Sequence, residues 1–108
     1  GESTGTEISV RYEPGPPPLI NDAACTETAR RAAASIFGDR LRSGGVRMSG
    51  EDFAKYENPK CFLALGGGSE DAEKRYPNHS PRFQIEESAL ASGVRFFVNY
   101  AFCYGEEL

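Results

Sequence analysis

The stretch CFLALGGG at residues 61–68 decides the fold class that we expect for this chain. Its apolar half, Cys61 to Leu65, follows Pro59 and ends at three consecutive glycines. A short continuous apolar run bounded by turn residues is typical of a strand buried on both faces inside a layered α/β domain. The glycines lack the Gly-Lys-Ser/Thr ending of a phosphate-binding loop, so we interpret them as a flexible loop.

Two helical patterns accompany the expected strand. Small and apolar residues recur at intervals of three and four over residues 22–37. Asn21 and Asp22, two good capping residues, stand at the start and Gly38 stands at the end, which predicts a capped helix there. A longer pattern over residues 85–104 carries two adjacent apolar stripes. One side of a small sheet cannot cover so wide a face, so we expect this helix to be sandwiched or to cover surface that belongs to a missing part.

A third, shorter helix is expected at about residues 50–57, after a short strand at 46–48. Ser49 is a good N-cap, and Glu51 and Asp52 lie in the first turn, where carboxylates favour the positive end of the helix dipole. Paired carboxylates at a strand-to-helix junction also mark metal and substrate sites in open α/β sheets. Both interpretations of the two acids stay open.

The N-terminal part of the chain predicts one strand and a spacer. Apolar and polar residues alternate over residues 7–13, the period of two expected of a strand with one buried face. The sequence PGPPP at residues 14–18 then enforces an extended, semi-rigid connector. The strand belongs either to a separate domain or to the edge of the same one.

Length, charge and cysteine content exclude some classes of function and partner. The chain has 108 residues, enough for one domain, and a formal net charge of −4, which argues against nucleic-acid and membrane partners. Its three cysteines, Cys25, Cys61 and Cys103, are widely spaced, so we expect free thiols in a reducing compartment, the cytoplasm. The sequence starts at Gly1 rather than at a methionine, and we expect it to be a piece of a longer protein.

His79, the only histidine, is the main candidate for chemistry. Pro77 and Pro81 flank it and stiffen its loop, so the imidazole is held in a fixed direction. It is a metal ligand, a general base or an ordinary hydrogen-bonded histidine. A nucleophilic pair with Cys61 is a weaker hypothesis, because that cysteine lies in the buried-strand pattern.

Four segments, taken together and in this order, are the basis of a family resemblance: MSGEDF at 48–53, CFLAL at 61–65, HSPRF at 79–83 and EESAL at 86–90. With them the chain resembles the C-terminal part of the aminoacylase, hippurate hydrolase and carboxypeptidase family of dinuclear metal-dependent amidohydrolases. The resemblance implies an α/β fold, a partial three-layer zinc-peptidase-like domain whose mixed sheet has flanking helices. It further implies that residues 1–15 are the last strand of a lid domain and the start of a linker, and that residues 16–108 are the C-terminal part of the catalytic domain.

The resemblance also assigns site residues. His79 matches the family's last metal ligand, Glu51 and Asp52 match a segment that supports the site, and Asn21 matches a hinge asparagine that contacts substrate. Two divalent metal ions, zinc or else manganese or cobalt, are implied for the parent enzyme. The remaining ligands and the general-base glutamate belong to the family's N-terminal half, and nothing in this sequence matches their motifs.

We therefore expect the C-terminal portion of an amidohydrolase or peptidase. The parent enzyme would hydrolyse the amide bond of N-acyl amino acids or small peptides by metal-activated water, with the missing N-terminal half as partner. One histidine cannot hold a catalytic metal, so we expect the isolated chain to bind metal weakly and to be inactive. The alternative is a non-catalytic binding module that uses the surface of helix 85–104 for a partner. A homodimer is a further expectation, because an incomplete core leaves apolar surface to cover.

Overall fold

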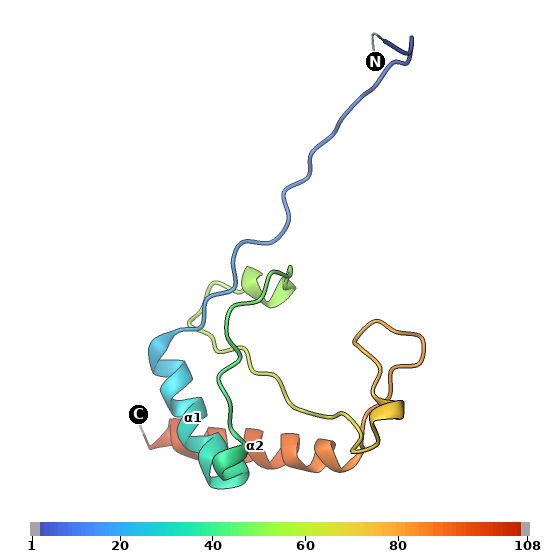
Figure 1. Cartoon of the computed structure of the whole chain (residues 1–108). Coiled ribbons are helices and arrows are strands. Elements are labelled where there is room, and N and C mark those ends of the chain that lie inside the picture. The colour runs from blue at the N-terminus through green and yellow to red at the C-terminus, as the bar shows by residue number, and fades with distance from the viewer. Residues whose placement is uncertain (1–2, 107–108) are drawn as a thin grey trace.

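A computed structural model gives the structure of the chain and describes residues 3–106. Within that range it has two α-helices and three short 3-10 turns (Figure 1). They are α1 (Ala23–Phe37), η1 (Gly38–Arg40), η2 (Asp52–Lys55), η3 (Ala72–Lys74) and α2 (Ser88–Gly105).

The expected α/β fold is wrong, because residues 3–106 form no strand and no sheet. The three segments predicted as strands, 7–13, 46–48 and 61–65, are irregular or extended, and neither the mixed sheet nor the lid strand is present in the described range. A strand requires a neighbour that takes up its backbone hydrogen bonds. Between residues 3 and 106 no group is hydrogen-bonded to the backbone of Leu63, Ala64 or Leu65. The apolar pattern predicted burial but could not supply a pairing partner.

The helix predicted at 22–37 is confirmed with both of its caps. Oδ1 of Asp22 accepts a hydrogen bond of 2.9 Å from the backbone N–H of Cys25, as an N-cap does. At the other end Gly38 adopts a φ of 53° and donates its N–H to the carbonyl of Ala34. A positive φ costs glycine little, so this residue ends α1 without strain.

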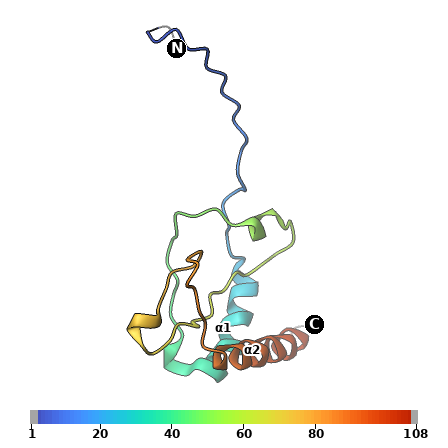
Figure 2. The same cartoon turned by 90° about the vertical axis from the view of Figure 1, so that its right-hand side faces the viewer.

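The core lies where α1 meets α2. The alanines Ala29, Ala32 and Ala33 are buried on one face of α1, and Phe96 of α2 is buried with them. Short side chains allow the two helices to approach closely, and they lie against each other in both views (Figure 2). Asn99 reinforces the crossing, since its Nδ2 donates to the carbonyl of Ala32 at 2.8 Å.

The other two helix predictions are partly right. The helix expected at 85–104 is α2, which begins three residues later, at Ser88. The helix expected at 50–57 is reduced to the 3-10 turn η2. No helix in the described part of the chain is long and apolar enough to cross a membrane.

The molecule is extended. Residues 3–20 form an arm that runs away from the helices (Figure 1), and the chain measures 65 × 41 × 19 Å. Its radius of gyration is 19.6 Å, against about 13 Å for a compact domain of this size. Much of the apolar face of α2 therefore stays in solvent: Phe97 is 71% exposed and Phe102 is 70% exposed.

Candidate functional site

His79 lies in a loop of two consecutive turns at the far end of α2 from α1 (Figure 1). The N–H of Ser80 donates to the carbonyl of Pro77 at 3.1 Å, and the N–H of Phe83 donates to the carbonyl of Ser80 at 3.0 Å. His79 has a φ of 68°, the only positive value at a non-glycine among residues 3–106. Such a backbone is unfavourable for a side-chain-bearing residue, and it marks His79 as held in place by the turns around it.

Arg82 and Tyr76 close the base of this loop. The guanidinium carbon of Arg82 lies 4.3 Å from the centroid of the Tyr76 ring, a cation–π contact. The backbone N–H of Arg82 also donates to Oγ of Ser80 at 3.2 Å. A cavity of about 260 Å³ lies beside the loop, with Tyr76, Asn78, Phe83 and Leu65 in its lining. His79 itself is not part of this lining, although its chain neighbour Asn78 is.

Glu51 and Asp52 have local partners. Glu51 is the N-cap of η2, and its Oε1 accepts a hydrogen bond of 3.0 Å from the N–H of Phe53. Asp52 pairs with Lys55 at 2.8 Å, and the hydrogen bond and charge of that lysine lower the pKa of the Asp52 carboxyl. Glu51 thus has the capping role that was one of the two interpretations of these acids, and Asp52 has an ion-pair partner. A supporting role for either acid at a metal or substrate site stays a prediction.

These residues do not converge on one centre. The loop that carries His79 and the turn η2 that carries Glu51 and Asp52 are separate in both views (Figures 1 and 2). No group of three or more His, Cys, Asp or Glu side chains within residues 3–106 is arranged to hold a metal ion. The described residues do not fit a complete metal centre: His79 offers one imidazole, and a catalytic zinc needs about three protein ligands.

Asn21 is bound to the segment that follows residue 60. Its Oδ1 accepts from the N–H of Phe62 at 2.9 Å, and its Nδ2 donates to the carbonyl of Phe62 at 3.0 Å. Nδ2 also lies 3.6 Å from the sulfur of Cys61. In this structure Asn21 holds residues 61 and 62 against the start of α1, and its role toward substrate stays a prediction.

The hypothesis that pairs Cys61 with His79 finds no support in the arrangement. Cys61 packs at the α1–α2 core, beside the first turn of α1. The His79 loop lies beyond the opposite end of α2 (Figure 1). A base that far from the thiol cannot take its proton directly.

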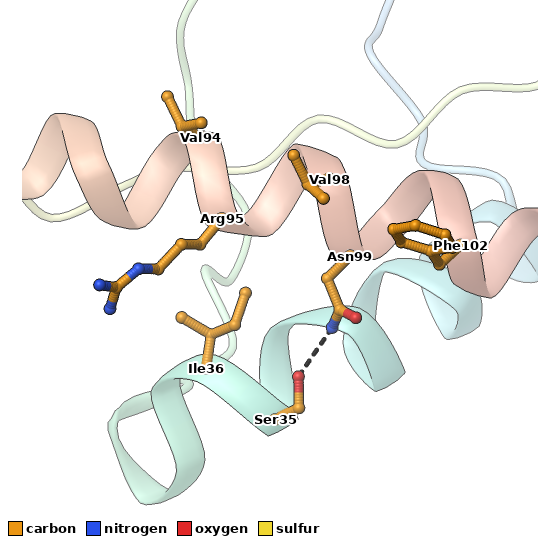
Figure 3. A pocket seen from close by; sticks show the side chains of 7 residues that line it. All are labelled: Ser35, Ile36, Val94, Arg95, Val98, Asn99 and Phe102. Atoms are coloured by element: carbon orange, nitrogen blue, oxygen red, sulfur yellow. Dashed lines mark hydrogen bonds between the residues drawn. The ribbon is translucent and has the colours of Figure 1, made fainter.

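Sequence reasoning missed a groove of about 470 Å³ between α1 and α2. Its walls are mainly apolar, with Val94, Val98 and Phe102 from α2 and Ile36 from α1 (Figure 3). At its edge Nδ2 of Asn99 donates to Oγ of Ser35 at 2.7 Å. The only sign of it in the sequence was Asn99, a single amide side chain between the apolar stripes of residues 85–104.

The family model for Peptidase family M20/M25/M40 matches residues 3–102. The chain belongs to this family. The match runs through the first helix, the η2 turn, the His79 loop and most of α2, and it confirms the resemblance to aminoacylases and hippurate hydrolases that the ordered segments indicated.

Two of the three relatives described next are named as enzymes that hydrolyse amides or remove acetyl groups, and the third is named as a ligase. A Bacillus subtilis (strain 168) protein named as an amidohydrolase, YhaA, is 32% identical over 93% of this chain and 26% of its own length. The N-acetyl-L-cysteine deacetylase of the same strain is 31% identical over 88% of this chain and 22% of its own length. A Rhodococcus jostii (strain RHA1) protein named as a glutamate–cysteine ligase is 38% identical over 83% of this chain, but only 12% of its own length.

The chain spans about a quarter or less of the length of these relatives. No solved structure matches it. The family and the names of most relatives place the chain in a hydrolase family.

Proposed function

We propose that this chain is the C-terminal portion of an amidohydrolase of the M20/M25/M40 family that cleaves the amide bond of N-acyl amino acids or small peptides in the cytoplasm. The observation that supports the proposal most is the family match over residues 3–102, which includes the rigid His79 loop. Two relatives named for amide or N-acetyl cleavage point to the same reaction type.

His79 is the residue of this chain that we assign to the metal centre of the whole enzyme. The two turns and the flanking prolines fix its backbone, and no hydrogen bond or ion pair within residues 3–106 engages its side chain. An imidazole without a competing partner is available to a metal ion. When bound, divalent zinc, manganese or cobalt would supply Lewis acidity.

The partner we propose is an N-terminal half that supplies the other ligands and the base. The apolar side chains that α2 leaves in solvent, such as Val94, Phe97 and Phe102, support this proposal. At about 25 cal/mol per Å² of apolar surface removed from water, covering that face would contribute several kcal/mol to association. Asn21 and the acids of η2 would then approach the site from this chain's side.

The test begins with the isolated chain. We expect no stoichiometric zinc, manganese or cobalt after dialysis, and no turnover of N-acetyl amino acids, N-acetyl-L-cysteine included, with any of the three metals added. Tight stoichiometric metal together with turnover would contradict the proposal that this chain needs a partner half.

The second step uses the longest reading frame that contains this segment. In an active enzyme of that length, His79→Ala should lower kcat/KM by about 100-fold or more and reduce bound metal, because one ligand is lost. Glu73→Gln, on the exposed turn η3, is the matched control and should leave both values unchanged. Full metal occupancy and activity in His79→Ala would remove His79 from the site.

The groove between α1 and α2 favours a second candidate, a non-catalytic interaction module. A reading frame that starts immediately before residue 1 would favour this alternative, whereas an upstream segment with the missing ligand motifs would favour the hydrolase.

A further inference from the structure

Two of the three cysteines lie where the first turn of α1 contacts the extended segment at residues 60–62. Cys25 lies in that first turn, and Cys61 lies in the segment. Both are free thiols, and both are only partly buried. They therefore remain within reach of a small oxidant.

Cys61 is fixed on both sides. The N–H of Asp22 donates to the carbonyl of Lys60 at 2.8 Å, and the N–H of Phe62 donates to Oδ1 of Asn21 at 2.9 Å. These two bonds flank Cys61 and tie its backbone to the two residues that precede α1. The position of its sulfur relative to the helix is thereby restricted to a small range.

The sulfur of Cys61 points at the same turn. Oγ1 of Thr26 and Nδ2 of Asn21 each lie 3.6 Å from Cys61 Sγ, within hydrogen-bond distance for sulfur. Thr26 is the residue directly after Cys25. The thiol of Cys61 is thus bound to the immediate neighbour of the other cysteine.

The surroundings of Cys25 disfavour its ionised form. Burial, the adjacent Asp22 carboxylate and the nearby charge of Cys61 all raise the pKa of the Cys25 thiol. The hydrogen bonds around Cys61 place its sulfur beside the turn of α1 that carries Cys25. Because burial and the Asp22 carboxylate disfavour the Cys25 thiolate, oxidation is expected to begin at Cys61.

We propose that Cys25 and Cys61 are a redox-sensitive pair that forms a reversible disulfide when the chain meets a peroxide. The Cys61 thiolate attacks one oxygen of hydrogen peroxide, the O–O bond breaks, and a sulfenic acid and hydroxide result. The Cys25 thiolate then attacks the sulfenic sulfur, and the S–O bond breaks as the S–S bond forms. Two thiols lose two electrons and two protons, and the peroxide becomes two waters.

The disulfide would join α1 covalently to the segment that Asn21 and Asp22 already hold by hydrogen bonds. Such a cross-link restricts the unfolded chain more than the folded one, so the oxidised form should melt at a higher temperature. A dithiol should reverse the change, as expected of a transient disulfide in a reducing compartment. The pair does not depend on the proposed hydrolytic function.

The test uses the unsubstituted, fully reduced 108-residue chain treated with hydrogen peroxide at low protein concentration. Free thiols are then blocked, and the chain is digested without reductant and mapped by mass spectrometry. We expect a peptide pair joined through Cys25 and Cys61, a loss of two hydrogen atoms from the intact mass, and an alkylated Cys103. Dithiothreitol should restore three free thiols.

Cys103, which packs on the same core from α2, is the internal control. Cys103→Ser should still form the linkage, and Cys25→Ser and Cys61→Ser should not. Far-UV circular dichroism shows whether each variant keeps its helices, and the mapping of the unsubstituted chain decides the matter even if a variant unfolds. A disulfide to Cys103, an intermolecular disulfide or over-oxidation of Cys61 without a link to Cys25 would each overturn the proposal.

Discussion

The side-chain amide of Asn21 forms hydrogen bonds with both backbone groups of Phe62. Oδ1 accepts the N–H at 2.9 Å, and Nδ2 donates to the carbonyl at 3.0 Å. An amide that receives and donates in this way substitutes for one residue of a neighbouring strand. It satisfies the backbone of a segment whose next three residues have no such partner within residues 3–106.

Asn21→Ala should release this segment. We expect a loss of about 1 kcal/mol in the free energy of unfolding, because two exposed hydrogen bonds are exchanged for bonds to water. Amide hydrogen exchange at Phe62 should become faster, whereas exchange in α2 should not change. Asn78→Ala, in the exposed His79 loop, is the control. Unchanged exchange at Phe62 in Asn21→Ala would contradict the role given to this side chain.

The stability of α1 should depend on pH because the Asp22 carboxylate caps this helix. The capping bond from the N–H of Cys25 is the main reason why the pKa of Asp22 is lowered from its usual 3.8. A carboxyl with a lowered folded-state pKa stabilises the fold above its unfolded pKa, and this contribution is lost as the pH falls through the folded value. Helicity measured by circular dichroism should therefore fall below about pH 4.

Asp22→Asn tests this explanation. Asparagine keeps an oxygen that caps the helix but does not titrate. The variant should remain helical at neutral pH and lose the part of the acid dependence that Asp22 causes. An acid transition identical to that of the unsubstituted chain would assign the dependence to other carboxyls.

Gly93→Ala should stabilise α2. Glycine within a helix costs roughly 1 kcal/mol relative to alanine. A Cβ at position 93 would meet Cδ2 of Leu65 at 3.2 Å, which is tight, but the Leu65 side chain is half exposed and can move aside. We expect a gain of about 0.5 kcal/mol in urea unfolding. A loss of stability would mean that Leu65 is held in place.

The isolated chain should associate or unfold easily. Its apolar residues on α2 lie largely in solvent, and the buried core consists mainly of alanines. Such a core is too small to stabilise a domain of this length strongly. Sedimentation should show dimers or a loosely folded monomer with a low melting temperature, and a compact, thermally stable monomer would contradict this expectation.

Local signals were sufficient to predict α1 to within one residue. Asp22 and Gly38 set its two ends through bonds to residues three or four positions away, and both are visible in the sequence. The start of α2 was predicted three residues early, because its N-cap residue, Glu87, makes no side-chain capping hydrogen bond and the apolar pattern begins before the helix. The expected helix at 50–57 became η2, since so short a helix gains few hydrogen bonds for the cost of its first turn.

The strands could not be predicted from local pattern. The run at residues 61–65 has the composition of a buried strand, yet pairing depends on backbone groups elsewhere, and within residues 3–106 only the side chain of Asn21 takes that place. The candidate site shows the same limit. The prolines around His79 predicted a fixed loop, which its two turns form, but neither its positive φ nor its distance from η2 followed from residue type.

The alanine face of α1 limits which substitutions this chain can tolerate. Ala32 is fully buried and Ala29 and Ala33 nearly so, with Phe96 packed against them. A larger side chain would push α2 away, and a glycine would loosen the helix itself. Replacement is therefore unfavourable in both directions, and a change of size at one of these sites should persist in descendants only when a residue of α2 changes in compensation.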